Sequence, residues 1–171
     1  MTLLDSLEDF VAKEGSTLKY RFGDKNIQID FDATPTISYD YLFIADNSEY
    51  SFHNEELNKK SSEEYPNKSD YAIYFEKIKS FCCRTLNESL HNSNHKEHIH
   101  TIKPNNKLKK IFTQIFCNKL LKDEDLPPFM QFSLYTNQND DKAPRIFCAI
   151  GNYAVIYILF YDPFHKIYVS K

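Results

Sequence analysis

The sequence predicts a single α+β domain, in which a mostly antiparallel sheet is covered by two amphipathic helices. Three observations support this class. The length of 171 residues is typical of one domain. Apolar residues alternate with period two near both ends of the chain, and between them two stretches carry apolar residues at helical spacing. Hydrophobic residues make up 42% of the chain, which is enough for a sizeable core.

The first part of the chain predicts a helix followed by strands. Residues 3–14 have leucines and other apolar residues at helical spacing, and Gly15 is placed to end this helix. In residues 18–31, apolar and polar side chains alternate on either side of a turn at 23–26, and this pattern predicts a β-hairpin. The aromatic alternation over 37–44 predicts a third strand.

The middle of the chain predicts a polar loop and two helices. Residues 45–69 are rich in Asn, Ser and charged side chains, and we expect a long, mobile surface loop with room for a short helix. An apolar stripe then predicts a helix over about 70–91, with Ser69 or Asp70 as its N-cap. A second stripe predicts a helix over about 105–121, which should pack on the C-terminal sheet.

The C-terminal part predicts a three-stranded meander over 129–135, 145–150 and 153–161. The dipeptide at 151–152, Gly-Asn, predicts a two-residue hairpin turn because both residues tolerate a positive φ. The last strand is apolar on both faces, so we expect it inside the sheet with cover on both sides.

Composition excludes several classes of function. Only three glycines are present, and neither glycine-rich nucleotide-binding motif occurs, which argues against Rossmann and P-loop enzymes. No apolar run is long enough to span a bilayer, and the acidic N-terminus does not resemble a secretory signal. We therefore expect a soluble, cytoplasmic protein with no membrane partner and with its four cysteines reduced. The net charge of −3 and the three arginines do not favour general nucleic-acid binding.

A histidine cluster follows the first of the two predicted helices. Its members, with the potential ligands nearby, are His91, His95, His98, His100, Cys82, Cys83 and Glu97. The spacing matches no standard zinc motif, so we expect no bound metal, no cofactor and a solvated loop. A structural zinc domain remains an alternative. On a strand, His98 and His100 would share one face and could act as an acid/base pair.

Arg84 and His91 have the spacing R-x6-H near the end of the predicted helix. This spacing resembles the signature of the HEPN ribonucleases. The resemblance implies that Arg84 stabilises phosphate charge and that His91 lines a shared cleft. It rests on these two residues.

The tail "FYDPFHKIYVSK" brings reactive residues to the end of the last strand. Asp162-Pro163 ends this strand, and His165 and Tyr168 follow. In an antiparallel hairpin the start of one strand lies beside the end of the next, so Arg145 should lie near Asp162 and His165. This group could tune a histidine for acid/base chemistry, or it could be a structural ion pair that caps the hairpin.

Residues 129–169 as a whole resemble the C-terminal part of small uncharacterised bacterial proteins found on mobile elements and in defence islands. More loosely, they resemble the last strands of RelE/ParE-type toxins. The resemblance implies action on mRNA or on a protein target, and it would carry over to Arg145, His165 and Tyr168.

The aromatic side chains between the hairpin and the polar loop have two interpretations. Tyr39, Tyr41, Phe43, Tyr50 and Phe52 could form a base-stacking platform, but strands are commonly enriched in such residues and core packing is the favoured interpretation.

Three functions are consistent with the sequence. The first is a non-enzymatic interaction protein of a bacterial antiviral defence or toxin–antitoxin system, either immunity- or antitoxin-like or an accessory subunit, whose partner is a cognate toxin or defence subunit. The second is a metal-independent endoribonuclease that acts on RNA. The third is the zinc domain. Candidate catalytic residues are His98, His100, Arg84, Arg145, His165 and Tyr168.

Overall fold

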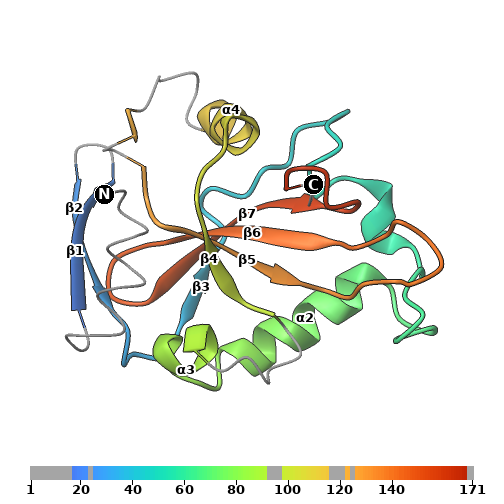
Figure 1. Ribbon diagram of the computed structural model, residues 1–171, viewed down its shortest axis with the longest axis horizontal. Coiled ribbons are helices and arrows are strands. Elements are labelled where there is room, and N and C mark those ends of the chain that lie inside the picture. The colour runs from blue at the N-terminus through green and yellow to red at the C-terminus, as the bar shows by residue number, and fades with distance from the viewer. Residues whose placement is uncertain (1–16, 23–24, 92–97, 116–121, 124–125, 169–171) are drawn as a thin grey trace.

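The protein has the predicted α+β class, with a mixed five-stranded sheet that is mostly antiparallel (Figure 1). The computed structural model describes residues 17–22, 25–91, 98–115, 122–123 and 126–168, and the predicted helix over 3–14 lies outside them. The strands are β1 (Thr17–Phe22), β2 (Lys25–Asp30), β3 (Thr36–Ser38), β4 (His100–Ile102), β5 (Phe129–Ser133), β6 (Arg145–Ile150) and β7 (Val155–Asp162). The helices are η1 (Glu55–Asn58), α2 (Asp70–Phe81), α3 (Leu86–His91) and α4 (Asn106–Ile115). No helix in the described part of the chain has the length and apolar character needed to cross a bilayer.

The central sheet has the strand order β3-β7-β6-β5-β4. Strands β5, β6 and β7 form the predicted antiparallel meander. Strand β7 lies inside the sheet, and most of its residues are buried, as its apolar sequence predicted. Strand β4 pairs antiparallel with β5 at one edge, and β3 pairs parallel with β7 at the other.

Two amphipathic helices cover opposite faces of this sheet, as predicted (Figure 1). Phe112 of α4 is fully buried, and its ring centroid lies 4.8 Å from that of Phe129. Tyr74 of α2 stacks on Phe132, with 6.1 Å between centroids. Because Phe129 and Phe132 are three residues apart on one strand, their side chains point to opposite faces. Residues 116–121 of the predicted second helix lie outside the described residues.

The single helix predicted over 70–91 is wrong, because the chain forms two helices there. Helix α2 begins after Ser69, whose side chain accepts a hydrogen bond from the Ala72 amide, so the predicted N-cap is confirmed. A capping box then starts α3: Thr85 N–H donates to Glu88 Oε2 at 2.8 Å, and Glu88 N–H donates to Thr85 Oγ1 at 3.1 Å. This reciprocal pair is a helix start signal, and it separates α3 from α2.

The strand predicted over 37–44 is also shorter than expected, because β3 ends at Ser38. A turn follows, in which the Leu42 amide donates to the Tyr39 carbonyl and the Asp40 amide donates to Ser38 Oγ. The chain returns to the sheet at Phe43, whose amide donates to the Leu159 carbonyl at 2.7 Å.

The two-residue turn predicted at Gly151-Asn152 is wrong as well. The loop between β6 and β7 spans 151–154, and its left-handed residue is Tyr153, with φ 56°. The Tyr153 amide donates to the Gln28 carbonyl, and the Asp30 amide donates to the Tyr153 carbonyl, both at 2.6 Å. These bonds join the β1–β2 hairpin, which was correctly predicted, to the loop between β6 and β7.

The polar segment 45–69 contains η1 and is anchored to the rest of the domain. Leu57 of η1 is buried in the core, and Lys142 from the loop between β5 and β6 reaches into the segment. Lys142 Nζ lies 3.0 Å from Glu56, 2.9 Å from Ser61 Oγ and 3.4 Å from Asp70. The mobility expected of this segment stays a prediction.

We expect Lys142→Met to lower the free energy of unfolding by about 3 to 5 kcal/mol, because it leaves two carboxylates without their shared cation in a buried position. Lys142 is only 5% exposed. Chemical denaturation measures the change, and Lys110→Met, at an exposed position of α4, is the matched control. A Lys142→Met loss no larger than the control's would contradict this account.

Candidate functional site

A cavity of about 570 Å³ lies on the α4 side of the sheet, at the end where β5 and β7 finish. Five of the six residues predicted as catalytic candidates line it, namely His98, His100, Arg145, His165 and Tyr168. They come from the start of β4, the start of β6 and the tail after β7.

The register of the sheet explains why residues far apart in the sequence meet here. His100 pairs with Gln131 across β4 and β5, Ser133 pairs with Arg145 across β5 and β6, and Arg145 pairs with Asp162. Residues directly opposite each other in an antiparallel pair project to the same face. Arg145 thus lies beside Asp162 and lines the same cavity as His165, so the predicted proximity of these three residues is confirmed.

Asp162 shapes the tail that carries His165. It is fully buried, and its two carboxylate oxygens accept hydrogen bonds from the amides of Lys166 and Ile167 at 3.0 and 2.9 Å. These bonds close a turn in which His165 has φ 51°. Asp162 thus caps the turn of the tail, and in doing so it fixes the position of His165.

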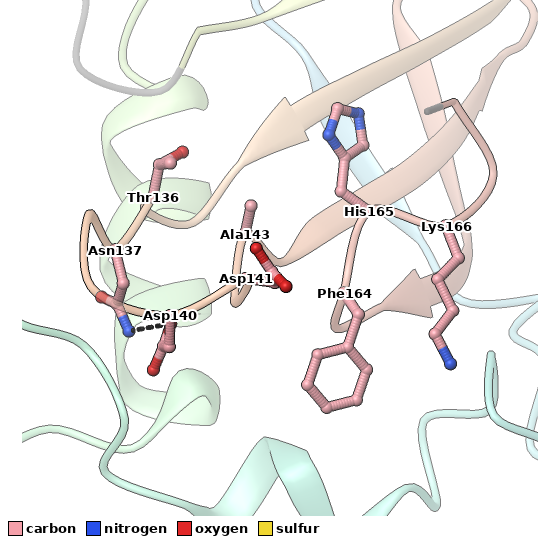
Figure 2. Close-up of a pocket in the computed structure, with 8 residues that line it drawn as sticks. All are labelled: Thr136, Asn137, Asp140, Asp141, Ala143, Phe164, His165 and Lys166. Carbon is pink, nitrogen blue, oxygen red and sulfur yellow. Dashed lines mark hydrogen bonds between the residues drawn. The ribbon is translucent and has the colours of Figure 1, made fainter. Parts of the chain in front are cut away.

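His165 lies between two cavities. The second, of about 810 Å³, is lined by Thr136, Asp141, Phe164 and Lys166 among others. Thr136 and His165 line both cavities. Figure 2 shows the His165 imidazole turned away from the side chains of Phe164 and Lys166, which come from the same turn.

His100 is held as a neutral imidazole with both ring nitrogens engaged. Its Nδ1 lies 3.2 Å from the His98 carbonyl oxygen, and its Nε2 lies 2.8 Å from Nε2 of Gln131. The carbonyl and the amide nitrogen define the tautomer, because Nδ1 must donate and Nε2 must accept. Burial lowers the pKa of His100, and the charge of Arg145 lowers it further.

His165 differs from His100 because one of its ring nitrogens is free. Its Nε2 is buried and has no hydrogen-bond partner within the described part of the chain. Burial lowers the pKa of His165, and the positive charge of Arg145 adds to this effect, while Asp162 opposes it. The result is a neutral imidazole whose Nε2 is not engaged by any described residue.

Arg145 supplies the positive charge of the site while it also closes the loop between β5 and β6. Its Nη1 donates to Ser133 Oγ at 2.8 Å and to the carbonyls of Tyr135, Ala143 and Pro144 at 3.1 to 3.3 Å. Burial lowers the pKa of its guanidinium, but an arginine keeps its proton under physiological conditions. The charge therefore persists in the cavity wall.

Tyr168 fastens the tail to α4. Its hydroxyl donates to the Lys103 carbonyl and accepts from the Asn105 amide at 3.3 Å, and its ring stacks on Phe147. Burial raises the pKa of the Tyr168 hydroxyl, so it stays protonated. Tyr168 lines the cavity, but its contacts give it a structural role.

Arg84 does not belong to this cavity. It lies in the short segment between α2 and α3, so Arg84 and His91 are not on one continuous helix. HEPN ribonucleases are all-helical, whereas this chain has a five-stranded sheet, and the R-x6-H resemblance therefore does not carry over.

The described residues also bear on the zinc alternative. Within them, no three His, Cys, Asp or Glu side chains gather closely enough to hold a metal ion. His95, Glu97 and Cys117 lie outside these residues. Cys82, Cys83 and Cys148 are free thiols.

The aromatic side chains considered for base stacking mostly pack into the core. Tyr50 is buried, and Tyr41, Phe43 and Phe52 are partly buried against the same cluster. Tyr39 is exposed, and its hydroxyl accepts a hydrogen bond from Tyr74 at 3.0 Å.

Three polar residues of the cavity, Gln131, Ser133 and Thr136, were not predicted as functional. A signal for two of them was present in the sequence. Gln131 and Ser133 are two residues apart in "FMQFSLY", a segment whose other residues are apolar or aromatic and which contains the buried strand β5. Polar side chains with period two on such a strand place a polar row on one face, and a buried polar row requires partners or a ligand.

Comparison with known protein families assigns the chain to one family. Residues 38–171 match the family described as uncharacterised protein UU032. This match covers more than half of the chain, so the chain belongs to that family. The matched region includes every residue that lines the cavity. No curated protein and no solved structure matches the chain.

The lowered pKa of His165 predicts a pH-dependent stability. The folded protein binds this proton more weakly than the unfolded chain, so the free energy of unfolding falls as pH drops below the ordinary histidine value near 6.5. We expect His165→Asn to reduce this fall between pH 7 and pH 5, by at most about 1.4 kcal/mol per pH unit. Asn tolerates the left-handed backbone at this position.

Denaturation at several pH values measures this slope. His53→Asn, at an exposed histidine outside the cavity, controls for the substitution itself. Identical slopes for wild type and His165→Asn would show that His165 is not a buried neutral imidazole.

Proposed function

We propose that the protein is a small metal-independent endoribonuclease whose active site is the 570 Å³ cavity. The observation that carries this proposal is the neutral His165, with its buried and unpartnered Nε2, beside the fixed charge of Arg145. A neutral imidazole can act as a general base, and a cation in a partly buried site stabilises developing negative charge on phosphate.

The reaction that fits these groups is attack by a ribose 2′-hydroxyl on the adjacent phosphate. His165 Nε2 takes the proton of the 2′-hydroxyl while O2′ forms a bond to phosphorus. The bond between phosphorus and O5′ breaks, and the leaving oxygen takes a proton from water. The products are a 2′,3′-cyclic phosphate and a 5′-hydroxyl, and Arg145 stabilises the extra negative charge on the phosphoryl oxygens.

The other histidines support His165 in this proposal. Both ring nitrogens of His100 are engaged, so His100 positions the neighbouring groups and exchanges no proton. His98 lies at the exposed rim and holds His100 through its carbonyl oxygen. Because the pKa of His165 is lowered, the base form persists under mildly acidic conditions, and cleavage should remain fast below pH 6.5.

We expect purified protein to cleave single-stranded RNA in the presence of EDTA, and His165→Asn to lower kcat/KM by about 100-fold or more, the effect of losing a general base. His53→Asn, outside the cavity, should cleave like the wild type. Detection of 2′,3′-cyclic phosphate ends by mass spectrometry identifies the chemistry. Equal cleavage by wild type and His165→Asn would reject His165 as the base.

A second candidate is the interaction protein of a bacterial defence or toxin–antitoxin system. The supporting observation is a group of exposed aromatic residues around α2. Phe75 is 50% exposed and Tyr71 is 41% exposed, and their rings lie 5.3 Å apart. Exposed aromatic clusters are typical of protein-binding surfaces.

This candidate predicts that Phe75→Ser weakens capture of a protein partner from the native host by at least tenfold, while thermal stability stays within about 1 °C because an exposed side chain is changed. Glu76→Ser, the adjacent exposed position on α2, is the control. The effect of the protein on its native host separates the two candidates. If His165→Asn abolishes that effect while Phe75→Ser preserves it, the ribonuclease proposal is favoured over the interaction protein.

A further inference from the structure

Gln131 combines burial, a fixed orientation and an unsatisfied acceptor at the cavity wall. It lies in the middle of β5, is 4% exposed and lines the cavity with the candidate residues. Its Nε2 is 2.8 Å from His100 Nε2. Its Oε1 is buried, and it has no hydrogen-bond partner among the residues that the structure describes.

The orientation of the Gln131 amide follows from the histidines. His100 Nδ1 donates to the His98 carbonyl, so the neutral ring presents Nε2 as an acceptor. Only the amide nitrogen of Gln131 can satisfy this acceptor. The carbonyl oxygen of the amide therefore points away from His100. It cannot exchange places with the nitrogen, because two acceptors would then face each other.

Other polar side chains of the cavity, among them Ser133 and Tyr168, already have partners. Ser133 Oγ accepts from Arg145 and donates to the Tyr135 carbonyl, and the Tyr168 hydroxyl bonds to backbone groups near α4. Gln131 Oε1 and His165 Nε2 are the buried side-chain atoms of this cavity that lack a partner within the described residues. Buried polar groups of native proteins are nearly always bonded, so each of these two atoms calls for a partner from outside the described chain, such as water or a ligand.

The chemistry of Oε1 restricts what can bind beside it. An amide oxygen accepts hydrogen bonds and donates none, and an ionised phosphate likewise carries acceptors only. Phosphate is therefore disfavoured next to Gln131 and favoured next to Arg145. A nucleotide in this cavity would place its phosphate toward β6 and a hydrogen-bond donor toward β5.

We propose that Gln131 is a specificity residue, whose Oε1 accepts a hydrogen bond from an N–H or O–H donor of the nucleotide that binds in the cavity. This inference rests on the proposed ribonuclease function, because it assumes that the ligand is a nucleotide. The donor has two sources, the N–H groups on the edge of the base and the ribose 2′-hydroxyl. His98 and His100 are then positioning residues, which keep the amide oxygen directed at the ligand.

The test measures binding rather than cleavage. Dissociation constants are determined by calorimetry or NMR titration for the four 3′-ribonucleotides and their 2′-deoxy counterparts, with the wild type, Gln131→Met and Gln114→Met. Methionine has nearly the same shape as glutamine and has no amide. Gln114, exposed on α4, is the matched control for the same chemical change.

We expect Gln131→Met to weaken binding of the preferred nucleotide by about tenfold and to remove its preference, while Gln114→Met changes neither. Loss of discrimination among bases identifies the base edge as the donor, and loss of discrimination between ribose and deoxyribose identifies the 2′-hydroxyl. Thermal melting of Gln131→Met should show only a modest loss of stability, because the variant removes an unsatisfied buried acceptor but also leaves His100 Nε2 without its donor.

A second variant checks the geometry without a ligand. Gln131→Glu replaces the donating nitrogen with a carboxylate oxygen, which can only accept a hydrogen bond and therefore favours the protonated Nε2–H of His100. The pKa of His100, followed by NMR, should rise well above its wild-type value. An unchanged pKa would show that Gln131 does not hold His100, and the proposed orientation of Oε1 would be wrong.

The outcomes separate this inference from the function on which it rests. If the wild type binds nucleotides and Gln131→Met keeps both affinity and preference, Gln131 is not a specificity residue, while the RNA cleavage assay still decides the ribonuclease proposal. If the wild type cleaves RNA but binds all nucleotides equally, the specificity inference also fails. If it neither cleaves RNA nor binds a nucleotide at millimolar concentration, both are overturned.

Discussion

The rest of the structure depends on the hydrogen bonds and the ion pair that the buried carboxylate of Asp70 forms. It is fully buried at the start of α2, where it accepts hydrogen bonds from the hydroxyls of Tyr135 at 2.6 Å and Tyr161 at 2.5 Å. Lys142 approaches it within 3.4 Å. Burial raises the pKa of Asp70, although the tyrosines and the lysine oppose this shift. One carboxylate thereby joins α2 to the end of β5, to β7 and to the loop between β5 and β6.

This network lies on one face of the sheet and shapes the site on the other. Tyr135 and Lys142 flank the loop between β5 and β6. The carbonyls of that loop, including the carbonyl of Tyr135, hold Nη1 of Arg145. Asp70, on the α2 side of the sheet, anchors the loop between β5 and β6. The backbone of this loop in turn holds the Arg145 guanidinium in the cavity. The two faces share a single loop, and a change in the packing of α2 would reach the cavity through it.

The parts of the fold that were predictable from sequence are those governed by local periodicity. The meander of β5, β6 and β7 and its antiparallel register followed from alternation, and with them the meeting of Arg145 and His165. The break between α2 and α3 was missed because the apolar stripe continues across it, although Thr85 and Glu88 form a capping box that the sequence displays. At that point the hydrogen bonds of the capping box, rather than the spacing of apolar residues, decide where the helix begins.

The contribution of His98 and His100 to the cavity was not predictable in the same way. Strand β4 has three residues, too few to show a period, and its place beside β5 is a long-range pairing. The turn at Tyr153 was missed for a related reason. A tyrosine disfavours a positive φ, and here two backbone hydrogen bonds to β2 hold it there. Both features depend on contacts between segments that are distant in sequence.

The polar row on β5 shows how the cavity relates to the stability of the fold. Gln131 and Ser133 occupy buried positions of an interior strand, where apolar side chains would pack without any need for partners. The Ser133 hydroxyl accepts a hydrogen bond from Arg145, and the amide nitrogen of Gln131 donates one to His100. These bonds offset the cost of burying the two groups. The remaining amide oxygen and the free nitrogen of His165 are left without compensation by the described part of the fold. Folding alone gains nothing from two such atoms in one cavity. Their presence is explained if binding, rather than folding, supplies their hydrogen bonds.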